Sequence, residues 1–176
     1  SFGKNDSMLM SHVSHKVKGI DFSTGSLGHG LPVATGAALA DRINKKKTKT
    51  FVILSDGELD EGSNWESLLF CSHHKLNNLV IIIDYNKIQS IDTIKKTLNL
   101  EPLTKKFQSF GCKVLNIDGH NFDKIFKALN SNSSKPLVII AHTVKGKGVS
   151  FMENSILWHY KSLDSENYQK AMKIIK

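Results

Sequence analysis

Two short apolar runs, each followed closely by a polar residue, constrain the fold of this chain most strongly. The first run covers residues 51–54 and leads to Asp56, and the second covers residues 79–83 and leads to Asn86, 30 positions after Asp56. Such runs are typical of buried parallel strands. If the two strands are neighbours, both side chains lie at the carboxyl edge of one sheet, where open α/β sheets bind ligands. A carboxylate and an amide oxygen there suit a hard cation such as Mg²⁺.

The rest of the chain alternates strand-like and helix-like segments, which predicts an α/β fold. The predicted strands cover residues 50–54, 79–84, 113–117 and 136–141. The predicted helices cover residues 31–43, 63–74, 101–110, 122–129 and 164–175. Strands separated by helices favour a mostly parallel sheet with helices on both faces.

Composition is ordinary for a globular chain and argues against a nucleic-acid-binding protein. The 176 residues suffice for one domain with a sizeable core, and 40% are hydrophobic and 23% charged. The net charge of +8 comes almost entirely from Lys, because Arg42 is the only Arg. Base readout and bidentate phosphate binding favour Arg. The densest basic cluster, residues 44–49, lies in a predicted loop without aromatic residues, which favours a solvated loop.

The sequence shows neither a membrane span nor an export signal. The longest apolar stretch, residues 79–83, is far too short to cross a bilayer, and the N-terminal residues lack the charged start and apolar core of a signal peptide. Cys71 and Cys112 lack metal-binding spacing and are expected to be small buried hydrophobes. These features together predict a cytoplasmic protein.

Four motifs in a fixed order indicate a family. They are SDGELDEGSNWE, HHKLNNLVIIIDYNKIQS, HTVKGKGVSFMEN and LWH. The first two contain the Asp-Gly and the Asn of the thiamine diphosphate fingerprint, at the spacing of that fingerprint. Together the four motifs resemble the N-terminal half of transketolases, and most of all the split bacterial kind, in which two shorter polypeptides share the work of one. The resemblance runs from about Phe2 to the final predicted helix.

This resemblance implies one transketolase-like diphosphate-binding domain over residues 1–176. Family members carry a ligand-facing His in a portion that precedes the matching segment, so the domain is expected to be incomplete at its N-terminus. The expected partner is a C-terminal transketolase subunit, which carries the pyrimidine-binding domain and its activating glutamate. A hetero-oligomer or homodimer acting on sugar phosphates is expected, with no nucleic-acid or membrane partner.

The resemblance also implies a set of metal ligands. Asp56 and Asn86 are expected to offer side-chain oxygens, and the backbone carbonyl of Ile88 is the expected third ligand. Mg²⁺ is the expected ion, with Ca²⁺ or Mn²⁺ as possible replacements. Ser55 stands where the family motif has its first Gly. Without the resemblance, Asp56 would suit an ordinary turn before Gly57, and Asn86 would suit an Asx turn.

Contacts to thiamine diphosphate follow from the same resemblance. Gly57 and Glu58 lie in a turn whose backbone amides suit a diphosphate beside a helix N-terminus. Glu61 matches a family glutamate at the subunit interface, although a first-turn Glu also complements the helix dipole. The remaining expected cofactor contacts are Gly25 and Leu27 against the aminopyrimidine, Gln89 near the thiazolium, and Lys145 and His159 beside the diphosphate.

Two histidines are expected to be catalytic. His12 matches a family His that hydrogen-bonds the hydroxyls of the donor sugar, and His159 matches one near the reacting carbonyl. Imidazole gives or takes protons near neutral pH, which suits these steps. Without the resemblance, His12 would suit a surface loop equally well, and Lys145 a solvated loop. The histidines expected to be structural are His73, His74, His120 and His142.

The glycine-rich stretch 24–40 is not a P-loop, because no Gly-Lys-Ser/Thr follows it. It resembles the family turn that leads into a helix, within which Gly36 is expected at a close-packing position.

The predicted function is the diphosphate- and Mg²⁺-binding half of a transketolase, which transfers a two-carbon ketol unit between sugar phosphates. Two alternatives use the same cofactor: a 2-oxo acid dehydrogenase subunit and a deoxyxylulose-phosphate synthase. Another is a catalytically inactive remnant that only binds partner or cofactor. A nucleotide-binding module is disfavoured, because no G-x-G-x-x-G follows the first strand. The isolated chain is expected to be inactive.

Overall fold

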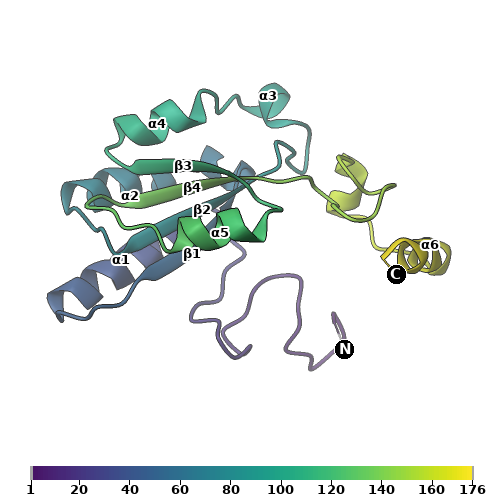
Figure 1. Ribbon diagram of the computed structural model, residues 1–176. Helices are drawn as coiled ribbons and strands as arrows, with labels where there is room; N and C mark the ends of the chain where they lie inside the picture. Colours follow the sequence, from purple (N-terminus) through teal and green to yellow (C-terminus); the bar gives the residue numbers. More distant parts are fainter. Residues whose placement is uncertain (1, 176) are drawn as a thin grey trace.

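The computed structural model describes residues 2–175 and contains one four-stranded sheet (Figure 1). The two end positions of the expected domain, 1 and 176, lie outside the described residues. All three strand pairings are parallel, and the strand order is β1-β2-β4-β3. The strands are β1 (Thr50–Ser55), β2 (Leu79–Tyr85), β3 (Lys113–Asp118) and β4 (Leu137–His142).

Six helices and two short 3₁₀ turns lie among the described residues. The helices are α1 (Gly30–Ile43), α2 (Gly62–His73), α3 (Ile94–Thr97), α4 (Leu103–Ser109), α5 (Phe122–Leu129) and α6 (Ser165–Ile175). The 3₁₀ turns are η1 (Gly57–Asp60) and η2 (Ile156–His159). The predicted α/β fold with a parallel sheet is therefore confirmed, and all nine predicted segments correspond to strands or helices with shifts of at most two residues at their ends.

Helices cover both faces of the sheet, but unequally. The larger core packs α1, α2 and α4 against one face, where Leu31, Leu68 and Phe107 are fully buried against strand residues such as Ile81. Each such side chain contributes about 1.5–3 kcal/mol by leaving water. Trp65 stacks on Phe107 with ring centroids 5.6 Å apart. The central strands β2 and β4 are buried on both faces, which explains their unbroken apolar runs.

The second face carries a smaller core under α5 alone (Figure 1). Ala128 of α5 packs there with Val80 and Ile139. Asn121 caps this helix, because its side-chain oxygen accepts a hydrogen bond from the backbone N–H of Lys124 at 3.0 Å.

The strand register brings the carboxyl ends of all four strands to one edge. Ser55 of β1 pairs with Asp84 of β2, and Tyr85 of β2 pairs with His142 of β4. Asp118 of β3 pairs with the same His142. Residues that follow the strands are therefore gathered along this edge, where α/β sheets bind ligands.

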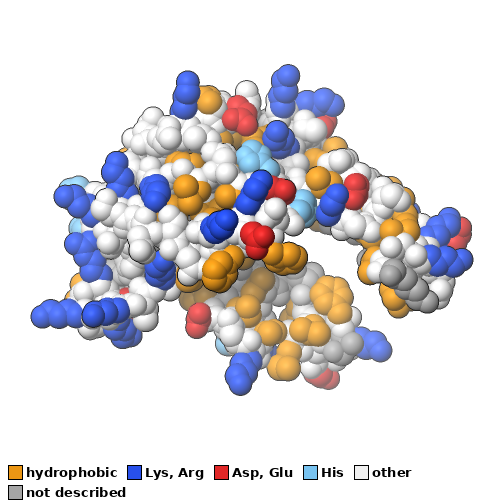
Figure 2. All heavy atoms as spheres, in the orientation of Figure 1, with side chains coloured by type: hydrophobic (Ala, Val, Ile, Leu, Met, Phe, Trp, Pro, Cys, Tyr) orange, Lys and Arg blue, Asp and Glu red, His pale blue; other side chains and the backbone are white. Residues whose placement is uncertain are grey.

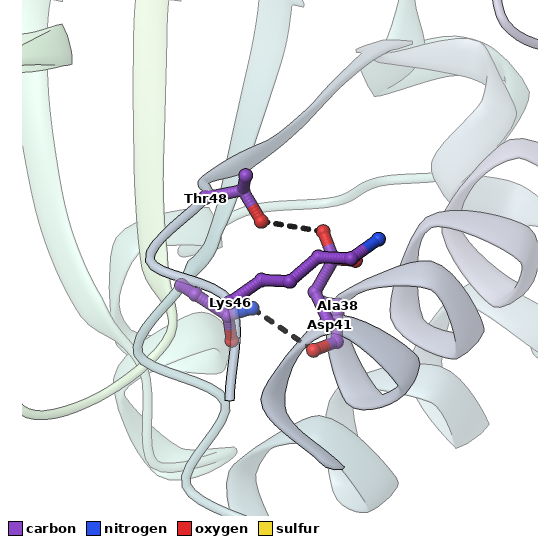
Figure 3. A network of polar contacts seen from close by, with 5 residues as sticks. Ala38, Asp41, Lys46 and Thr48 are labelled. Carbon is purple, nitrogen blue, oxygen red and sulfur yellow. Dashed lines mark hydrogen bonds and ion pairs between the residues drawn. The ribbon is translucent and has the colours of Figure 1, made fainter. Parts of the chain in front are cut away.

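The basic loop lies at the opposite, amino edge of the sheet, between α1 and β1. Figure 3 shows Asp41 of α1 holding this loop, because its carboxylate accepts a hydrogen bond from Thr48 at 2.5 Å and pairs with Lys46 at 3.2 Å. These two contacts, with Thr48 the larger cause, lower the pKa of Asp41. The residues before α1 and after β4 extend away from the sheet, and Figure 2 shows apolar side chains gathered on the N-terminal segment.

Three expectations about individual positions can be compared with the fold. Cys71 and Cys112 are buried free thiols that share the larger core, as expected of small hydrophobes. The close-packing interpretation of Gly36 is wrong within this chain, because a Cβ placed there would meet no described atom within 4 Å. No helix within residues 2–175 combines the length and apolar character needed to cross a membrane.

The larger core predicts a strong difference between two phenylalanines. Phe107→Ala should lower the free energy of unfolding by about 3–5 kcal/mol, because Phe107 is fully buried and stacked on Trp65. Phe122→Ala is the control and should change it by less than about 0.5 kcal/mol, because this side chain is 86% exposed. Urea unfolding of both variants measures the difference, and equal losses would contradict this description of the core.

Candidate functional site

The loop after β1 buries a carboxylate at the carboxyl edge of the sheet. Asp56 is only 1% exposed and directly precedes η1. Its Oδ2 accepts a hydrogen bond of 2.6 Å from the backbone N–H of Lys87, which follows the neighbouring strand β2. This bond joins the ends of the two strands, in keeping with the parallel pairing of β1 and β2.

The loop after β2 presents the second predicted ligand beside the first. Asn86 is half-buried, and its Oδ1 accepts a 3.0 Å hydrogen bond from the backbone N–H of Ile88. This is an Asx turn, so the local structure expected of an isolated Asn is present here. Lys87, between them, has a positive φ of 66°, which tightens the turn. The oxygens of Asp56 and Asn86 thus contact consecutive backbone amides of one short loop.

The buried carboxylate has no cationic partner among the described side chains. Desolvation is the main cause that raises the pKa of Asp56 to about 6, and the nearby charge of Asp84 raises it further, while backbone hydrogen bonds from Lys87, Gly57 and Asn86 oppose the rise. None of the ion pairs within residues 2–175 involves Asp56. A bound cation would offset this cost.

The donor chemistry around Asp56 fits a hard divalent ion. A carboxylate, an amide oxygen and a main-chain carbonyl are all oxygen ligands, which Mg²⁺ and Ca²⁺ prefer. No cluster of three or more His, Cys, Asp or Glu residues suited to a metal occurs in the described part of the chain. The oxygen atoms of Asp56, Asn86 and Ile88 therefore suit the expected ion, and no rival cluster of His, Cys, Asp or Glu occurs among the described residues.

The turn after Asp56 connects to the glycine-rich stretch through Glu58. The Oε1 atom of Glu58 accepts a 3.0 Å hydrogen bond from the backbone N–H of Gly28, and Ser63 donates a 2.6 Å hydrogen bond to the carbonyl of the same glycine. Gly28 has a φ of +81°, and a Cβ there would lie 2.8 Å from the Cβ of Glu61. A side chain at this position is therefore excluded, and Glu61 itself remains exposed at the start of α2.

Two further residues pack around the same turn. Gln89, a predicted cofactor contact, is buried beside Gly57, with its Cγ 3.2 Å from where a Cβ would stand on that glycine. The Nε2 group of Gln89 donates a 3.0 Å hydrogen bond to Asp60. Ser55, which replaces a family glycine, accepts a 3.1 Å hydrogen bond from the N–H of Glu58 through its hydroxyl. The substitution thus gives the η1 turn a contact that glycine lacks.

His12 lies against Gly25, so two of the predicted site residues are in contact. A Cβ on Gly25 would stand 2.7 Å from the imidazole Cδ2 of His12, so only glycine allows this contact. His12 is exposed, and Leu27 is 51% exposed. His12 and Gly25 are therefore in contact, and both His12 and Leu27 are accessible.

Lys145 and His159 come together after β4. The pKa of His159 is lowered, first by partial burial and then by the positive charge of Lys145. A lowered pKa keeps the imidazole neutral at neutral pH, so it is available as a proton acceptor. The backbone carbonyl of Lys145 accepts a 2.9 Å hydrogen bond from the backbone N–H of Asn154, which fixes the loop between them.

Two cavities open at this edge of the sheet, and Asn86 lines both. One has a volume of about 360 Å³ and is lined in part by Asp84, Lys145 and His120. The other has a volume of about 570 Å³ and is lined in part by Ile88. Asn86, Ile88 and Lys145 therefore border concave surfaces, as a binding site requires.

His120 borders the site although the sequence singles it out for no functional role. The sequence predicts a structural histidine, yet His120 lines the 360 Å³ cavity together with Lys145. Its place just after β3 is the signal that could have found it, because residues that follow parallel strands gather at the binding edge.

Comparison with known proteins gives a consistent family. The family model described as "Transketolase, thiamine diphosphate binding domain" matches residues 1–175. One subunit of an apulose-4-phosphate transketolase from Actinobacillus succinogenes is 41% identical over all of this chain and 65% of its own length. A 6-deoxy-6-sulfo-D-fructose transketolase subunit from a Clostridium species is 41% identical over 94% of this chain and 62% of its own length.

Solved structures agree with the family. The transketolase of Campylobacter jejuni superposes with a TM-score of 0.90 at 31% identity, over 98% of this chain and 28% of that protein. This chain thus spans somewhat less than two thirds of its split-type relatives and about a quarter of the full-length enzyme. By sequence and by fold, the chain belongs to the thiamine diphosphate-binding domain family of transketolases.

Proposed function

We propose that this chain is the diphosphate- and Mg²⁺-binding part of a transketolase that transfers a two-carbon ketol unit between sugar phosphates. The proposed domain covers residues 1–176. The observation that carries the proposal is the buried, uncompensated carboxylate of Asp56, hydrogen-bonded to the loop that presents Asn86. Family membership supports the cofactor, and the loop geometry supports the ion.

In this proposal Asp56, Asn86 and the carbonyl of Ile88 hold Mg²⁺. The ion accounts for the buried charge, because it supplies the positive partner that the described side chains do not. Mg²⁺ held there would leave coordination positions open, which suits an ion that binds phosphate oxygens.

The diphosphate itself is bound by groups that surround the two loops. The backbone of Gly57 and Glu58 offers amides at the η1 turn, and Lys145 offers a positive charge in the cavity that Asn86 also lines. Gln89, whose side chain is buried against Gly57, would approach the thiazolium. These assignments rest on position and chemistry together.

Two histidines handle protons and hydroxyls in the proposed reaction. Thiamine diphosphate, when bound, supplies the nucleophilic carbon that breaks and makes carbon–carbon bonds next to a carbonyl. His159, kept neutral by burial and by Lys145, takes or gives a proton near the reacting carbonyl. His12 hydrogen-bonds the hydroxyls of the donor sugar.

A second polypeptide completes the proposed enzyme. Two of the relatives are named as single subunits of apulose-4-phosphate transketolases, which implies another polypeptide in those systems. For this chain we propose a C-terminal subunit with a pyrimidine-binding domain, docking near Gly25, Leu27 and the exposed Glu61. Leu27 is 51% exposed at the glycine-rich turn, so it is accessible to such a partner.

The proposal predicts that the chain alone does not turn over. Purified chain with Mg²⁺ and thiamine diphosphate should show no ketol transfer in a coupled assay, because the proposed partner supplies the other half of the cofactor site and general acid–base catalysis depends on positioning. Adding the C-terminal partner should restore activity, and adding a chelator should remove it again. Turnover by the isolated chain would refute the division of labour. No activity with a competent partner would favour the inactive remnant.

The raised pKa of Asp56 predicts that the pH which favours stability of the metal-free fold differs from the pH which favours binding. Its folded pKa of about 6 exceeds the unfolded 3.8, so the folded state holds this proton more tightly. The stability that this bound proton contributes to the folded state is fully present below pH 3.8 and is lost as pH rises through about 6. Asp56→Asn cannot ionise, so without metal it should melt higher than the wild type at about pH 8, by about 6 °C, because a pKa raised from 3.8 to about 6 corresponds to about 3 kcal/mol.

At about pH 5 the difference in melting temperature should shrink, because the wild-type carboxyl is then largely protonated. The same variant should lose thiamine diphosphate binding in the complex with the partner. Asp21→Asn is the matched control, since Asp21 is exposed in the N-terminal segment, and it should change neither property. A lower melting temperature for Asp56→Asn at both pH values would show that the carboxylate stabilises the metal-free fold.

A further inference from the structure

The turn after β3 is pressed against the segment after β4. The backbone N–H of Gly119 donates a 2.8 Å hydrogen bond to the carbonyl of His142. A Cβ on Gly119 would lie 2.5 Å from the Cγ2 of Thr143, so only glycine allows this approach. His120, the next residue, is placed by this contact directly beside residues 143–144.

His120 uses its side chain to hold the backbone of that segment. Its Nε2 accepts a 2.8 Å hydrogen bond from the N–H of Val144. Its own backbone N–H donates a 3.0 Å bond to the Oδ1 of Asp118, which fixes the turn on the β3 side. An acceptor Nε2 carries no proton, so the neutral ring has its proton on Nδ1.

The anchored segment is the one that carries Lys145. His120, Val144 and Lys145 all line the 360 Å³ cavity, and Asn86 lines it as well. Thr143 donates a hydrogen bond to Asp84 of β2, which secures the start of the loop. His120 and Asp84 therefore hold two successive residues immediately before the lysine.

The loop beyond this anchor is closed by the hydrogen bond from the Asn154 amide to the Lys145 carbonyl, and it contains two glycines. Gly146 and Gly148 have φ values of +74° and +96°, and a displaced loop gains more entropy from glycine than from other residues. The hydrogen bond from Val144 to His120 is exposed, so water takes the place of the imidazole when the acceptor is removed. Loss of the His120 contact would thus release Val144 and displace the lysine that follows it.

We propose that His120 is a positioning residue, which holds the 143–147 loop so that Lys145 faces the cavity that takes the cofactor's diphosphate. The hydrogen bond from the Val144 amide to His120 supports the anchoring of the loop. The effect on the cofactor rests on the proposed function.

Two variants separate the acceptor from the rest of the side chain. His120→Gln keeps an acceptor oxygen at a reach similar to that of Nε2, whereas His120→Leu keeps the bulk and removes the acceptor. His73→Leu is the control, because His73 is exposed at the end of α2, at the other edge of the sheet. Exchange of the Val144 amide, measured by NMR on the full chain, should be about tenfold faster in His120→Leu only.

The second measurement is calorimetry of thiamine diphosphate with Mg²⁺ and the C-terminal partner. His120→Leu should weaken binding by about tenfold, and His120→Gln should restore it to within about twofold of the wild type. If exchange accelerates but affinity stays unchanged, the positioning role is overturned. Unchanged Val144 exchange in His120→Leu would overturn the anchor itself. If the wild-type complex does not bind the cofactor, the proposed function is overturned, and so is the proposed effect of His120 on cofactor binding. The exchange of the Val144 amide would still test whether His120 anchors the loop.

Discussion

The hydrogen bond from the Lys87 amide to the Asp56 carboxylate is the interaction on which the site depends. It exists because β1 and β2 are parallel neighbours, so their carboxyl ends reach the same edge. It draws the loop of Asn86, which lines both adjoining cavities, toward the buried acid. The fold thereby brings together residues that are far apart in sequence, and the two cores on either face of the sheet hold them there.

The burial of Asp56 concentrates an energetic cost at the candidate site, because desolvation disfavours the charged carboxylate. Backbone hydrogen bonds do not compensate a fully buried carboxylate, and the nearby Asp84 adds repulsion. Perturbed acids of this kind gather at functional sites, where a ligand supplies what the protein lacks. A divalent ion would turn this costly charge into a binding centre. In the proposed enzyme, a partner subunit would contact the exposed Glu61 and the glycine-rich turn and would supply the other half of the cofactor site.

The sequence predicts elements that carry a repeated apolar pattern, and it misses short elements that form within a single turn. The strands and α5 are predictable because their apolar pattern extends over several residues. The short elements η1, α3 and η2 escape prediction, because each is only four residues long and carries no periodic signal. The anchoring role of His120 is equally invisible, since its hydrogen-bond donor is a backbone amide 24 residues away. The close-packing prediction for Gly36 is wrong because a glycine in a helix does not by itself indicate a close contact.

The central claim is that Asp56, Asn86 and the carbonyl of Ile88 bind one divalent ion. A crystal of the chain with its partner, thiamine diphosphate and Mn²⁺ would locate that ion directly by anomalous scattering. The account predicts one peak about 2.2 Å from an oxygen of each of the three residues and in contact with the diphosphate. A peak held instead by Asp84 in the cavity beside β4, or cofactor bound with no peak near Asp56, would contradict it.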